Sequence, residues 1–526
     1  STMSLEPCPR AIVGGTLIDG TGRQPLKDSV VVLKDEWIEA VGKRGEVSVP
    51  DGAELVDASG KTVIPGLIDA HMHFLGMGMR MIRTVNLSDT RSVEEAMENV
   101  KRKVAETRKG DWVLGGGWDE SKWVEKRYLT KYDLDPFSKD NPVLLSRICG
   151  HLLTLNSKAL EIANITKDTP NPPGGRVDKN EEGEPTGVLR DAGQLVWPHV
   201  PSPSEEMALD GLRRACDYAL ILGCTGIHEA GMDAFGVRAY QKAAERGFLK
   251  VRTYIMWRAV QAGSMEALGL RTGFGNDMLR LGSAKLLIDG SLGARTAALF
   301  EPYEDDPSTR GLTMMSVDEL KEKVKTVHRQ GSQVAIHAIG DYGIELAINA
   351  IEEAIKDSPR KDHRHRIEHC EILTSTQIER IRQLGIVASV QPNFVGEWSW
   401  PEGLYETRLG RKRLRQNNPY RLLLDEGVHV AFGSDGMPFK PIYGIWSAVS
   451  HPIRESRITL EEAIKCYTLD SAFASFEEDI KGSIEPGKLA DITILEEDLS
   501  EIPTDKIKDV SVHMTIIGGK ILYSKN

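Results

Sequence analysis

Long apolar runs are absent from this sequence: none approaches the roughly 20 residues that a membrane-spanning helix requires. Positive charge is also in deficit, because 66 Lys and Arg residues face 77 Asp and Glu residues, for a net charge of −11. This balance argues against a nucleic-acid groove and against binding to an anionic membrane surface. Residues 1–5 lack the basic region and apolar core of a signal peptide. We therefore expect a cytoplasmic protein that acts on a small molecule and has neither a nucleic-acid nor a membrane partner; a homodimer is compatible with the sequence.

Cysteine is scarce and scattered. No two of the six cysteines form a Cys-x-x-Cys pair, so we expect reduced thiols that are buried or inert. A zincin helix is excluded as well, because His228-Glu229 has no second histidine at the required spacing. The chain of 526 residues exceeds what one hydrophobic core usually covers, which predicts two or three structural units.

A pair of histidines ends the most informative segment of the chain. His71-Met72-His73 follows residues 62–70, whose almost wholly apolar character is typical of a strand buried on both faces. Residues i and i+2 of a strand project to the same side, so the two imidazoles can offer two nitrogen ligands to one metal ion. Alone the pattern is weak evidence, because His-x-His often arises by chance.

Further ligand-type side chains occur in later apolar segments. Lys285 lies within one of them, and Asp435 ends the last. His337 and His369 lie near the ends of two others. Helix-like stretches separate these segments, so strand, ligand, loop and helix repeat in that order. This order predicts an α/β fold, a (β/α)8 TIM barrel, whose functional side chains gather at the C-terminal ends of its strands.

The barrel and two additional regions can be placed along the chain. The roughly 150 residues between the first and second strands far exceed a loop, so residues 76–205 are expected to form an inserted lid subdomain. Short Val- and Ile-rich strands at both chain ends predict a composite β-sandwich of residues 1–62 and 480–526. Within a barrel of residues 63–479, we expect strands at 63–73, 225–231, 251–258, 284–290, 333–339, 364–370, 386–392 and 429–435.

Several motifs accompany these strand ends. They are Pro65-Gly66-Leu67-Ile68-Asp69-Ala70-His71-Met72-His73, Lys285 with residues 289–297, His337-Ala338-Ile339-Gly340-Asp341, His365-Arg366-Ile367-Glu368-His369, Gly433-Ser434-Asp435 and residues 482–491. In type and order they resemble the amidohydrolase superfamily of metal-dependent hydrolases. The resemblance is to the branch called amidohydrolase family 3, which includes N-substituted formamide deformylases. It indicates superfamily and branch, but not substrate.

The ligand set follows from the residues and the resemblance together. The imidazoles of His71, His73, His337 and His369 are expected to bind metal. Asp435 is expected to be both ligand and catalytic residue, because one carboxylate oxygen can bind the metal while the other accepts a proton from water. The alternative is that Asp435 only caps the following turn, since Ser-Asp-Gly is favourable turn chemistry.

Lys285 permits two interpretations. A lysine in an apolar strand is unfavourable as a cation unless it is paired or neutral, and strand alternation places Lys285, Leu287 and Asp289 on one face, expected to line the lumen. The resemblance implies a carbamylated Lys285 that bridges two metal ions, one on the histidine pair with Asp435 and one on the two later histidines. Otherwise Lys285 is unmodified and contacts substrate or a carboxylate, and a single metal is bound. Nitrogen and oxygen ligands favour zinc and leave iron, manganese and cobalt open.

Four other side chains are expected to bind substrate. In the insert, the resemblance suggests a substrate-facing His151, and Trp118, which follows a glycine run, is a second candidate. Ser291 and Arg295 lie on the loop after the fourth strand, where Arg295 can clamp a substrate carboxylate. The alternatives are ordinary packing for His151 and Trp118, and an ion pair with Glu301 or Asp305 for Arg295.

These expectations converge on a metal-dependent hydrolase that cleaves a non-peptide carbon–nitrogen bond in an amide, N-acyl or N-formyl compound. In this hypothesis Asp435 takes a proton from water and returns it to the leaving nitrogen. One alternative is a mononuclear-metal deaminase of a heterocycle, which needs no carbamate, so metal stoichiometry separates the two. The other is a non-catalytic barrel kept for partner binding, which would refuse added metal.

Overall fold

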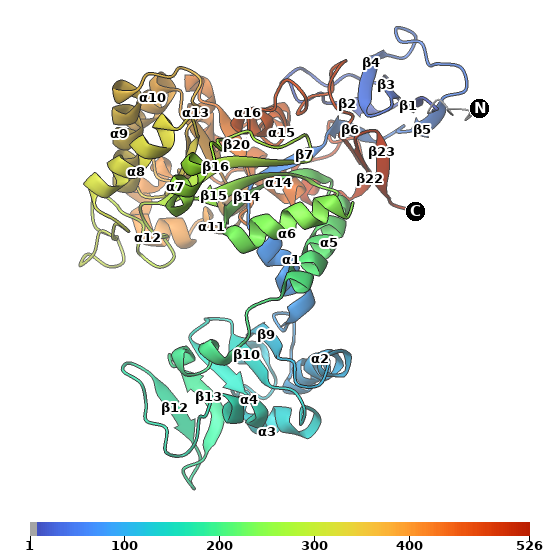
Figure 1. Cartoon of the computed structure of the whole chain (residues 1–526). Helices are drawn as coiled ribbons and strands as arrows, with labels where there is room; N and C mark the ends of the chain where they lie inside the picture. Colours follow the sequence, from blue (N-terminus) through green and yellow to red (C-terminus); the bar gives the residue numbers. More distant parts are fainter. Residues whose placement is uncertain (1–7) are drawn as a thin grey trace. The chain divides into compact units, whose positions relative to one another are not determined.

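The chain forms two compact units (Figure 1). The computed structural model describes residues 8–526, so residues 1–5, considered above for a signal peptide, lie outside the described part. The first unit combines the chain up to Phe74 with Ala215–Asn526, and the second is Leu75–Arg214. The boundaries fall at α1 (Phe74–Arg83) and within α5 (Glu205–Ile221). Across residues 8–526, no helix is both long and apolar enough to cross a membrane.

A parallel eight-stranded barrel forms the centre of the first unit, which confirms the predicted fold class. The strands are neighbours in chain order, and most of their residues are buried because one face packs on helices and the other fills the barrel. The loop after the last strand also reaches the first, since the Asp435 N–H donates to the His71 carbonyl at 2.8 Å. The strands are β7 (Leu67–Met72), β14 (Cys224–Met232), β15 (Arg252–Arg258), β16 (Leu279–Leu287), β17 (Val334–Ala338), β18 (Arg366–His369), β19 (Val387–Val390) and β20 (Val430–Phe432).

The predicted first strand, residues 63–73, is in fact two strands in different sheets. β6 (Thr62–Pro65) pairs with β21 (Ile492–Leu495) outside the barrel, and β7 begins after Gly66. Close packing at the break requires a glycine, because a Cβ at Gly66 would lie 2.2 Å from Oγ1 of Thr225. Both strands are apolar and buried, so hydrophobic pattern alone does not separate them.

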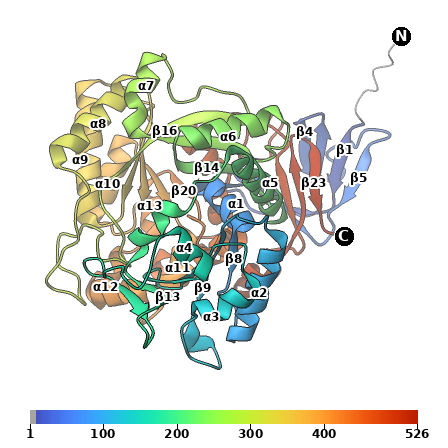
Figure 2. The same ribbon diagram turned by 60° about the horizontal axis from the view of Figure 1, so that its bottom comes forward.

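Amphipathic helices cover the outside of the barrel. The hydroxyl of Ser316 caps α8 by accepting from the Glu319 N–H, and the buried residues Leu320, Val324 and Val327 recur at helical spacing. α8, α9 and α10 pack side by side (Figure 2). The helices of the first unit from Ala234 onward are α6 (Ala234–Glu245), α7 (Ala262–Ala267), α8 (Val317–Arg329), α9 (Asp341–Asp357), α10 (Ser375–Leu384), α11 (Pro392–Trp398), α12 (Leu404–Arg413), α13 (Tyr420–Glu426), α14 (Pro441–Val449), α15 (Leu460–Cys466) and α16 (Leu469–Ala474).

Both chain ends contribute to a small β-sandwich in the first unit. Its sheets have the orders β4-β3-β1-β5 and β2-β6-β21-β22-β23. Val31, Val63 and Ile492 belong to the apolar core of this sandwich. Its remaining strands are β1 (Arg10–Val13), β2 (Thr16–Leu17), β3 (Ser29–Lys34), β4 (Trp37–Lys43), β5 (Glu54–Asp57), β22 (Val512–Ile517) and β23 (Lys520–Ser524).

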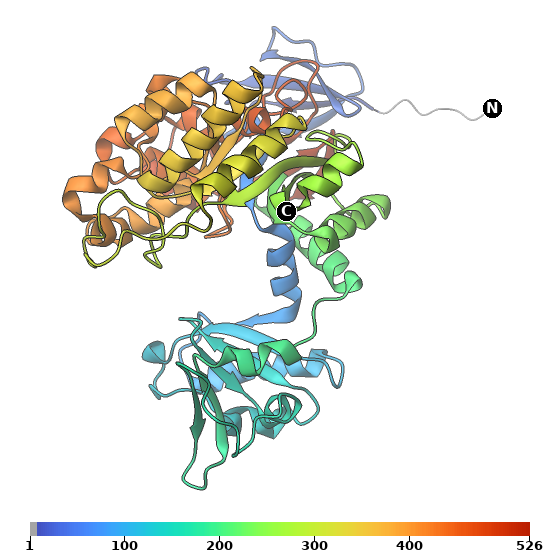
Figure 3. The ribbon, with the colours of Figure 1, turned by 60° about the vertical axis from the view of Figure 1, so that its left-hand side comes forward.

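The second unit has a sheet and an apolar core of its own (Figure 3, cyan to green). Its strands run in the order β12-β13-β11-β10-β9-β8. Residues 75–214 are therefore a packed structure and not an extended loop. Its elements are β8 (Thr84–Asn86), α2 (Val93–Glu106), β9 (Val113–Trp118), α3 (Lys131–Leu134), β10 (Val143–Arg147), β11 (Leu152–Leu155), α4 (Ser157–Ile162), β12 (Arg176–Lys179) and β13 (Pro185–Arg190).

Candidate metal centre

Three predicted ligands converge at the carboxyl ends of β7 and β20. The Nε2 atoms of His71 and His73 lie 3.4 and 3.3 Å from Oδ1 of Asp435. One ligand atom from each residue can be chosen so that all three lie within 4.8 Å of one another. Burial alone would raise the pKa of Asp435, but the surrounding histidines, with His71 foremost, hold that pKa well below its usual range. Asp435 is therefore an ionised carboxylate, the form that binds a cation.

Two atoms of this cluster are buried without a hydrogen-bond partner among residues 8–526. They are Nε2 of His71 and Oδ1 of Asp435. Leaving a buried polar atom unsatisfied costs about 1–3 kcal/mol, so such atoms in a native protein require an explanation. A divalent cation would supply a partner for both. The donor set, two imidazoles and one carboxylate, fits a transition-metal site.

His337 and His369 extend the cluster from the ends of β17 and β18. The ring centroids of His71 and His369 are 4.6 Å apart, and those of His337 and His369 are 4.5 Å apart. Burial lowers the pKa of His337 to about 4 and that of His369 well below its usual value. Both rings are therefore neutral at pH 7, as a metal ligand must be.

The protein holds one ring nitrogen of each of His71, His337 and His369. Nδ1 of His71 bonds to Glu368 at 2.8 Å, and Nδ1 of His369 bonds to Gln391 at 2.6 Å. For His337 the bonded atom is Nε2, 2.8 Å from the Gly290 carbonyl. Such contacts fix the ring and leave the other nitrogen for a metal. Nothing singled out Gln391 in the sequence.

Lys285 shares a cavity with these ligands. The cavity has a volume of about 610 Å³ and is bordered by the four predicted histidine ligands, Asp435 and Lys285. Lys285 is 9% exposed, and its amine forms no hydrogen bond or ion pair with any of the described residues. Burial lowers the pKa of that amine, despite the nearby carboxylates of Glu368 and Asp435.

The prediction that Lys285, Leu287 and Asp289 line the lumen together is only partly correct. Leu287 borders the cavity, as does Leu286, but Asp289 does not. β16 ends at Leu287, so strand alternation no longer applies to Asp289. Its carboxylate instead accepts backbone N–H bonds from Ile339, Gly340 and Ala298, and burial raises its pKa to about 7.

A buried ion pair contacts the metal cluster through His71. Arg366 and Glu368 are fully buried and paired at 2.9 Å, and Ser389 donates to Glu368 at 2.9 Å. The same carboxylate accepts the hydrogen bond from His71. The sequence motif around Arg366 and Glu368 did not reveal their role. Opposite charges at positions i and i+2 of an apolar strand are nevertheless a signal, because buried charges are rarely unpaired.

The two candidate substrate-binding residues after β16, Ser291 and Arg295, form hydrogen bonds with other residues of the chain. Arg295 bonds to both oxygens of Asp305, at 2.8 and 3.3 Å, and Arg408 also donates to that carboxylate. The hydroxyl of Ser291 accepts from the Ala294 N–H at 3.2 Å. Neither Ser291 nor Arg295 borders the metal cavity. For Arg295, the contacts match the ion-pair alternative.

The two candidates in the second unit differ from each other. Trp118 is wholly buried and stacks on Trp123 at 5.5 Å, which matches the packing alternative. His151 is exposed, and its Nδ1 lies 2.9 Å from a carboxylate oxygen of Asp191. A substrate contact of His151 stays a prediction.

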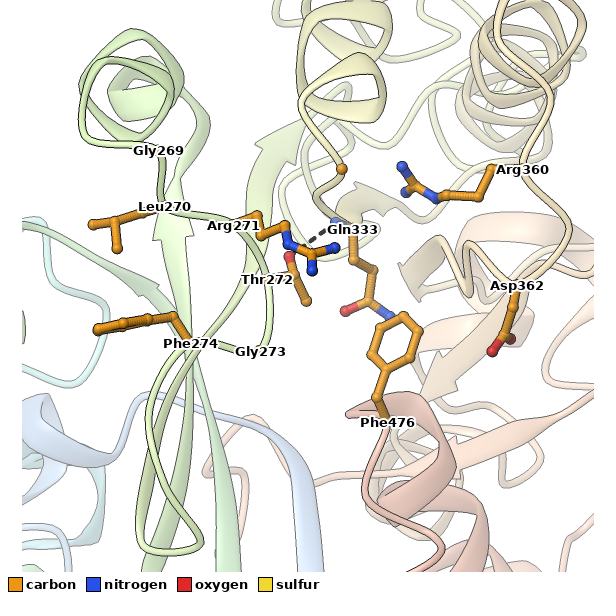
Figure 4. A pocket seen from close by; sticks show the side chains of 11 residues that line it. Gly269, Leu270, Arg271, Thr272, Gly273, Phe274, Gln333, Arg360, Asp362 and Phe476 are labelled. Carbon is orange, nitrogen blue, oxygen red and sulfur yellow. Dashed lines mark hydrogen bonds between the residues drawn. The ribbon is translucent and has the colours of Figure 1, made fainter.

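A second cleft lies at the other ends of the strands (Figure 4). Gln333, just before β17, and Phe476, after α16, are among its lining residues, as are Arg271 and Arg360. None of the predicted ligands borders it. Active sites of barrels of this kind form at the carboxyl ends of the strands, so the metal cavity is the candidate site.

The chain is similar to known proteins along most of its length. A model of the amidohydrolase family matches residues 54–523. YtcJ of Bacillus subtilis is 33% identical, over 95% of this chain and 97% of its own. The N-substituted formamide deformylase of Arthrobacter pascens is 28% identical, over 94% of this chain and 95% of its own. The crystal structure of a metal-dependent hydrolase from Pyrococcus furiosus has a TM-score of 0.77 and 29% identity, over 93% of this chain and 99% of that one.

Proposed function

Because this chain belongs to the amidohydrolase family, we propose that it is a metal-dependent hydrolase of a non-peptide carbon–nitrogen bond, in an amide, N-acyl or N-formyl compound. The observation that carries the proposal is a pair of buried atoms without a hydrogen-bond partner, Nε2 of His71 and Oδ1 of Asp435, which lie 3.4 Å apart and beside His73. The similarity to an N-substituted formamide deformylase supports an N-formyl or N-acyl substrate.

The residues present would hold two ions in this proposal. His71, His73 and Asp435 would hold one, and His337 with His369 the other. Lys285 would bridge them after its amine adds carbon dioxide and loses a proton, which gives a carbamate with two oxygens. The buried amine without a partner supports this role. Zinc fits the mixture of nitrogen and oxygen ligands.

The chemistry divides between the ions and the side chains. Divalent ions supply Lewis acidity toward the carbonyl and toward water. Asp435 accepts a proton from the attacking water, whose oxygen bonds to the carbonyl carbon, and delivers that proton to nitrogen as the C–N bond breaks. Glu368 holds the His71 ring through Nδ1 and thereby directs Nε2 toward the centre. The products are a carboxylic acid and an amine.

Metal stoichiometry and a substrate screen test the proposal. Elemental analysis of metal-loaded protein should find about two ions per chain, and Lys285→Ala should lose at least one. The same wild-type protein should hydrolyse members of a panel of N-acyl and N-formyl amines. The function would instead be that of a mononuclear deaminase if two results were found together. The wild type and Lys285→Ala would each hold one ion, and the wild type would act on an amino heterocycle but on none of the N-acyl and N-formyl amines. Protein that takes up no added metal would contradict both.

A further inference from the structure

One arginine borders the metal cavity without an internal partner. Arg258 is the last residue of β15, and its register partner on β16 is Lys285. Its side chain lines the same cavity as the predicted ligands and is exposed. With residues 8–526, its guanidinium forms no hydrogen bond and no ion pair. All five of its N–H donors are therefore available to a ligand.

The charges around this cavity are unbalanced. Asp435 is the one acidic residue among those that line it, and it already belongs to the metal cluster. The basic lining residues are Arg258, Lys323 and the buried Lys285. Lys323 has a partner, Glu319, at 3.2 Å. Arg258 is thus an exposed cation at the cavity with no acid to neutralise it, which favours an anionic ligand.

The rest of the cavity wall is apolar. A cavity of about 610 Å³ with few polar groups suits a small organic molecule. A ligand that matches both features has a hydrocarbon part and one anionic group. The apolar lining residues are Ala230, Ala259, Val260, Leu286, Leu287 and Met315.

A carboxylate is the anion that this arrangement fits best. A guanidinium binds a planar carboxylate through two parallel hydrogen bonds. Arg295, the side chain considered for this role from the sequence, is held by Asp305 instead. Arg258 has no such competitor and borders the cavity where the reacting bond would lie.

We propose that Arg258 forms a carboxylate subsite, and that the substrates are N-acyl or N-formyl amino acids with an apolar side chain. This inference rests on the hydrolase function proposed above and names its substrate class. The carboxylate is held by Arg258, the side chain lies along the apolar wall, and the amide lies at the metal ligands. The products are an amino acid and the short acid.

A matched pair of substrates isolates the carboxylate. N-formyl-leucine and N-formyl-leucinamide have nearly the same shape, but only the first carries the charge. Wild-type protein should have the higher kcat/KM on N-formyl-leucine. Arg258→Met should lower kcat/KM for N-formyl-leucine by about 10- to 100-fold, the usual effect of losing hydrogen bonds to a charged group. It should leave kcat/KM for N-formyl-leucinamide nearly unchanged. Arg258→Lys should keep part of the preference, because it keeps the charge but not the paired geometry.

Arg271→Met is the matched control. Arg271 is also exposed and without an internal partner, but it lines the cleft at the opposite strand ends (Figure 4). Its loss removes the same charge from the molecule and should leave kcat/KM for both substrates unchanged. An equal loss of activity in Arg258→Met and Arg271→Met would mean that overall charge, and not a subsite, governs the preference.

Binding measurements separate the subsite from the hydrolase function. If metal-loaded protein hydrolyses neither compound, calorimetric titration should still detect N-formyl-leucine bound to wild type and not to Arg258→Met. That outcome rejects the hydrolase proposal and keeps the subsite. Wild-type protein that binds or hydrolyses the amide as well as the acid overturns the subsite, as does an Arg258→Met variant that loses activity equally on both substrates.

Discussion

At the scale of single residues, the proposed function gives Asp435 two roles, metal ligand and proton acceptor, which a substitution can separate. Asp435→Asn keeps an oxygen that can bind metal, but the amide cannot accept the proton of water. We expect kcat to fall by about 10²–10⁴-fold while KM and metal content change little, because proton transfer matters mainly in the transition state. Steady-state kinetics together with elemental analysis measure this. A variant with full metal content and near-normal kcat would assign the proton to another group.

Glu368 is predicted to act on the metal through His71. Glu368→Gln removes the charge that holds Nδ1 of His71 and leaves the buried Arg366 uncompensated. We expect metal affinity to fall by about 10–100-fold, the usual effect of losing such a contact, together with a loss of stability. Competition with a chelator and chemical denaturation measure the two effects.

Ser389→Ala is the control for Glu368→Gln. It removes one donor to the same carboxylate and keeps both charges, so metal affinity should change by less than in Glu368→Gln. If the two variants bind metal equally well, the charge of Glu368 does not act on His71.

At the scale of elements, three histidines connect α8 to the starts of β17 and β18. The Val334 N–H donates to Nδ1 of His365 at 2.9 Å, and His365 then donates from Nε2 to Nδ1 of His328 at 2.8 Å. Nδ1 of His363 accepts the His365 N–H, also at 2.8 Å. Nε2 of His328 donates to the Ser358 carbonyl at 2.6 Å, and Nε2 of His363 donates to the Leu384 carbonyl at 2.7 Å. Because each ring both accepts and donates, each must be neutral for these bonds to exist.

The pH dependence of stability should follow from this neutrality. Burial lowers the pKa of His363 to about 4, whereas an unfolded histidine titrates near about 6.5. The unfolded state therefore binds the proton first as pH falls. The neutral His363 ring therefore contributes fully to the free energy of unfolding above pH ~6.5. This contribution, roughly 2–3 kcal/mol, is lost as the pH falls from ~6.5 to ~4.

His363→Asn keeps an acceptor for the His365 N–H but does not titrate in this range. Its loss of unfolding free energy between pH ~6.5 and ~4 should be smaller than that of wild type, as measured by denaturant titration at each pH. His199→Asn is the control, because it replaces an exposed histidine. Its free energy of unfolding should change with pH as that of the wild type does. A His363→Asn slope equal to that of wild type would show that the ring is protonated in the folded state.

The residues that the sequence identified and those that it did not differ in a physical way. His71, His369 and Asp435 could be found because a polar side chain at the end of an apolar strand is conspicuous. The split of the first strand at Gly66 depends on a close approach to Thr225, far along the chain, which no local pattern encodes. Arg295 and Trp118 lie at positions in the sequence that are compatible with substrate binding. Their actual partners, Asp305 and Trp123, are apparent only from the structure.

At the scale of the whole molecule, all predicted metal ligands lie in the first unit. A ligand that binds only the folded state stabilises the region that it orders. Removal of metal with a chelator should therefore increase hydrogen exchange in β7, β17 and β18, and should leave β9, β10 and β11 of the second unit unchanged. Hydrogen exchange followed by mass spectrometry distinguishes these segments. An equal increase in both units would mean that metal stabilises the chain as a single cooperative structure.

The hydrogen bond between the Asp435 N–H and the His71 carbonyl has a consequence for how the protein is made. His71 leaves the ribosome early, and its ligand partner Asp435 follows only after the second unit and seven further barrel strands. Domains tend to fold as they emerge, but contacts between such distant residues form late. A nascent chain thus carries an exposed histidine pair with no carboxylate to complete the site. In the proposed function, the ion held by His71, His73 and Asp435 can gain its full ligand set only after Asp435 has been translated, and a chain that is cut short before Asp435 lacks the group that accepts the proton of water.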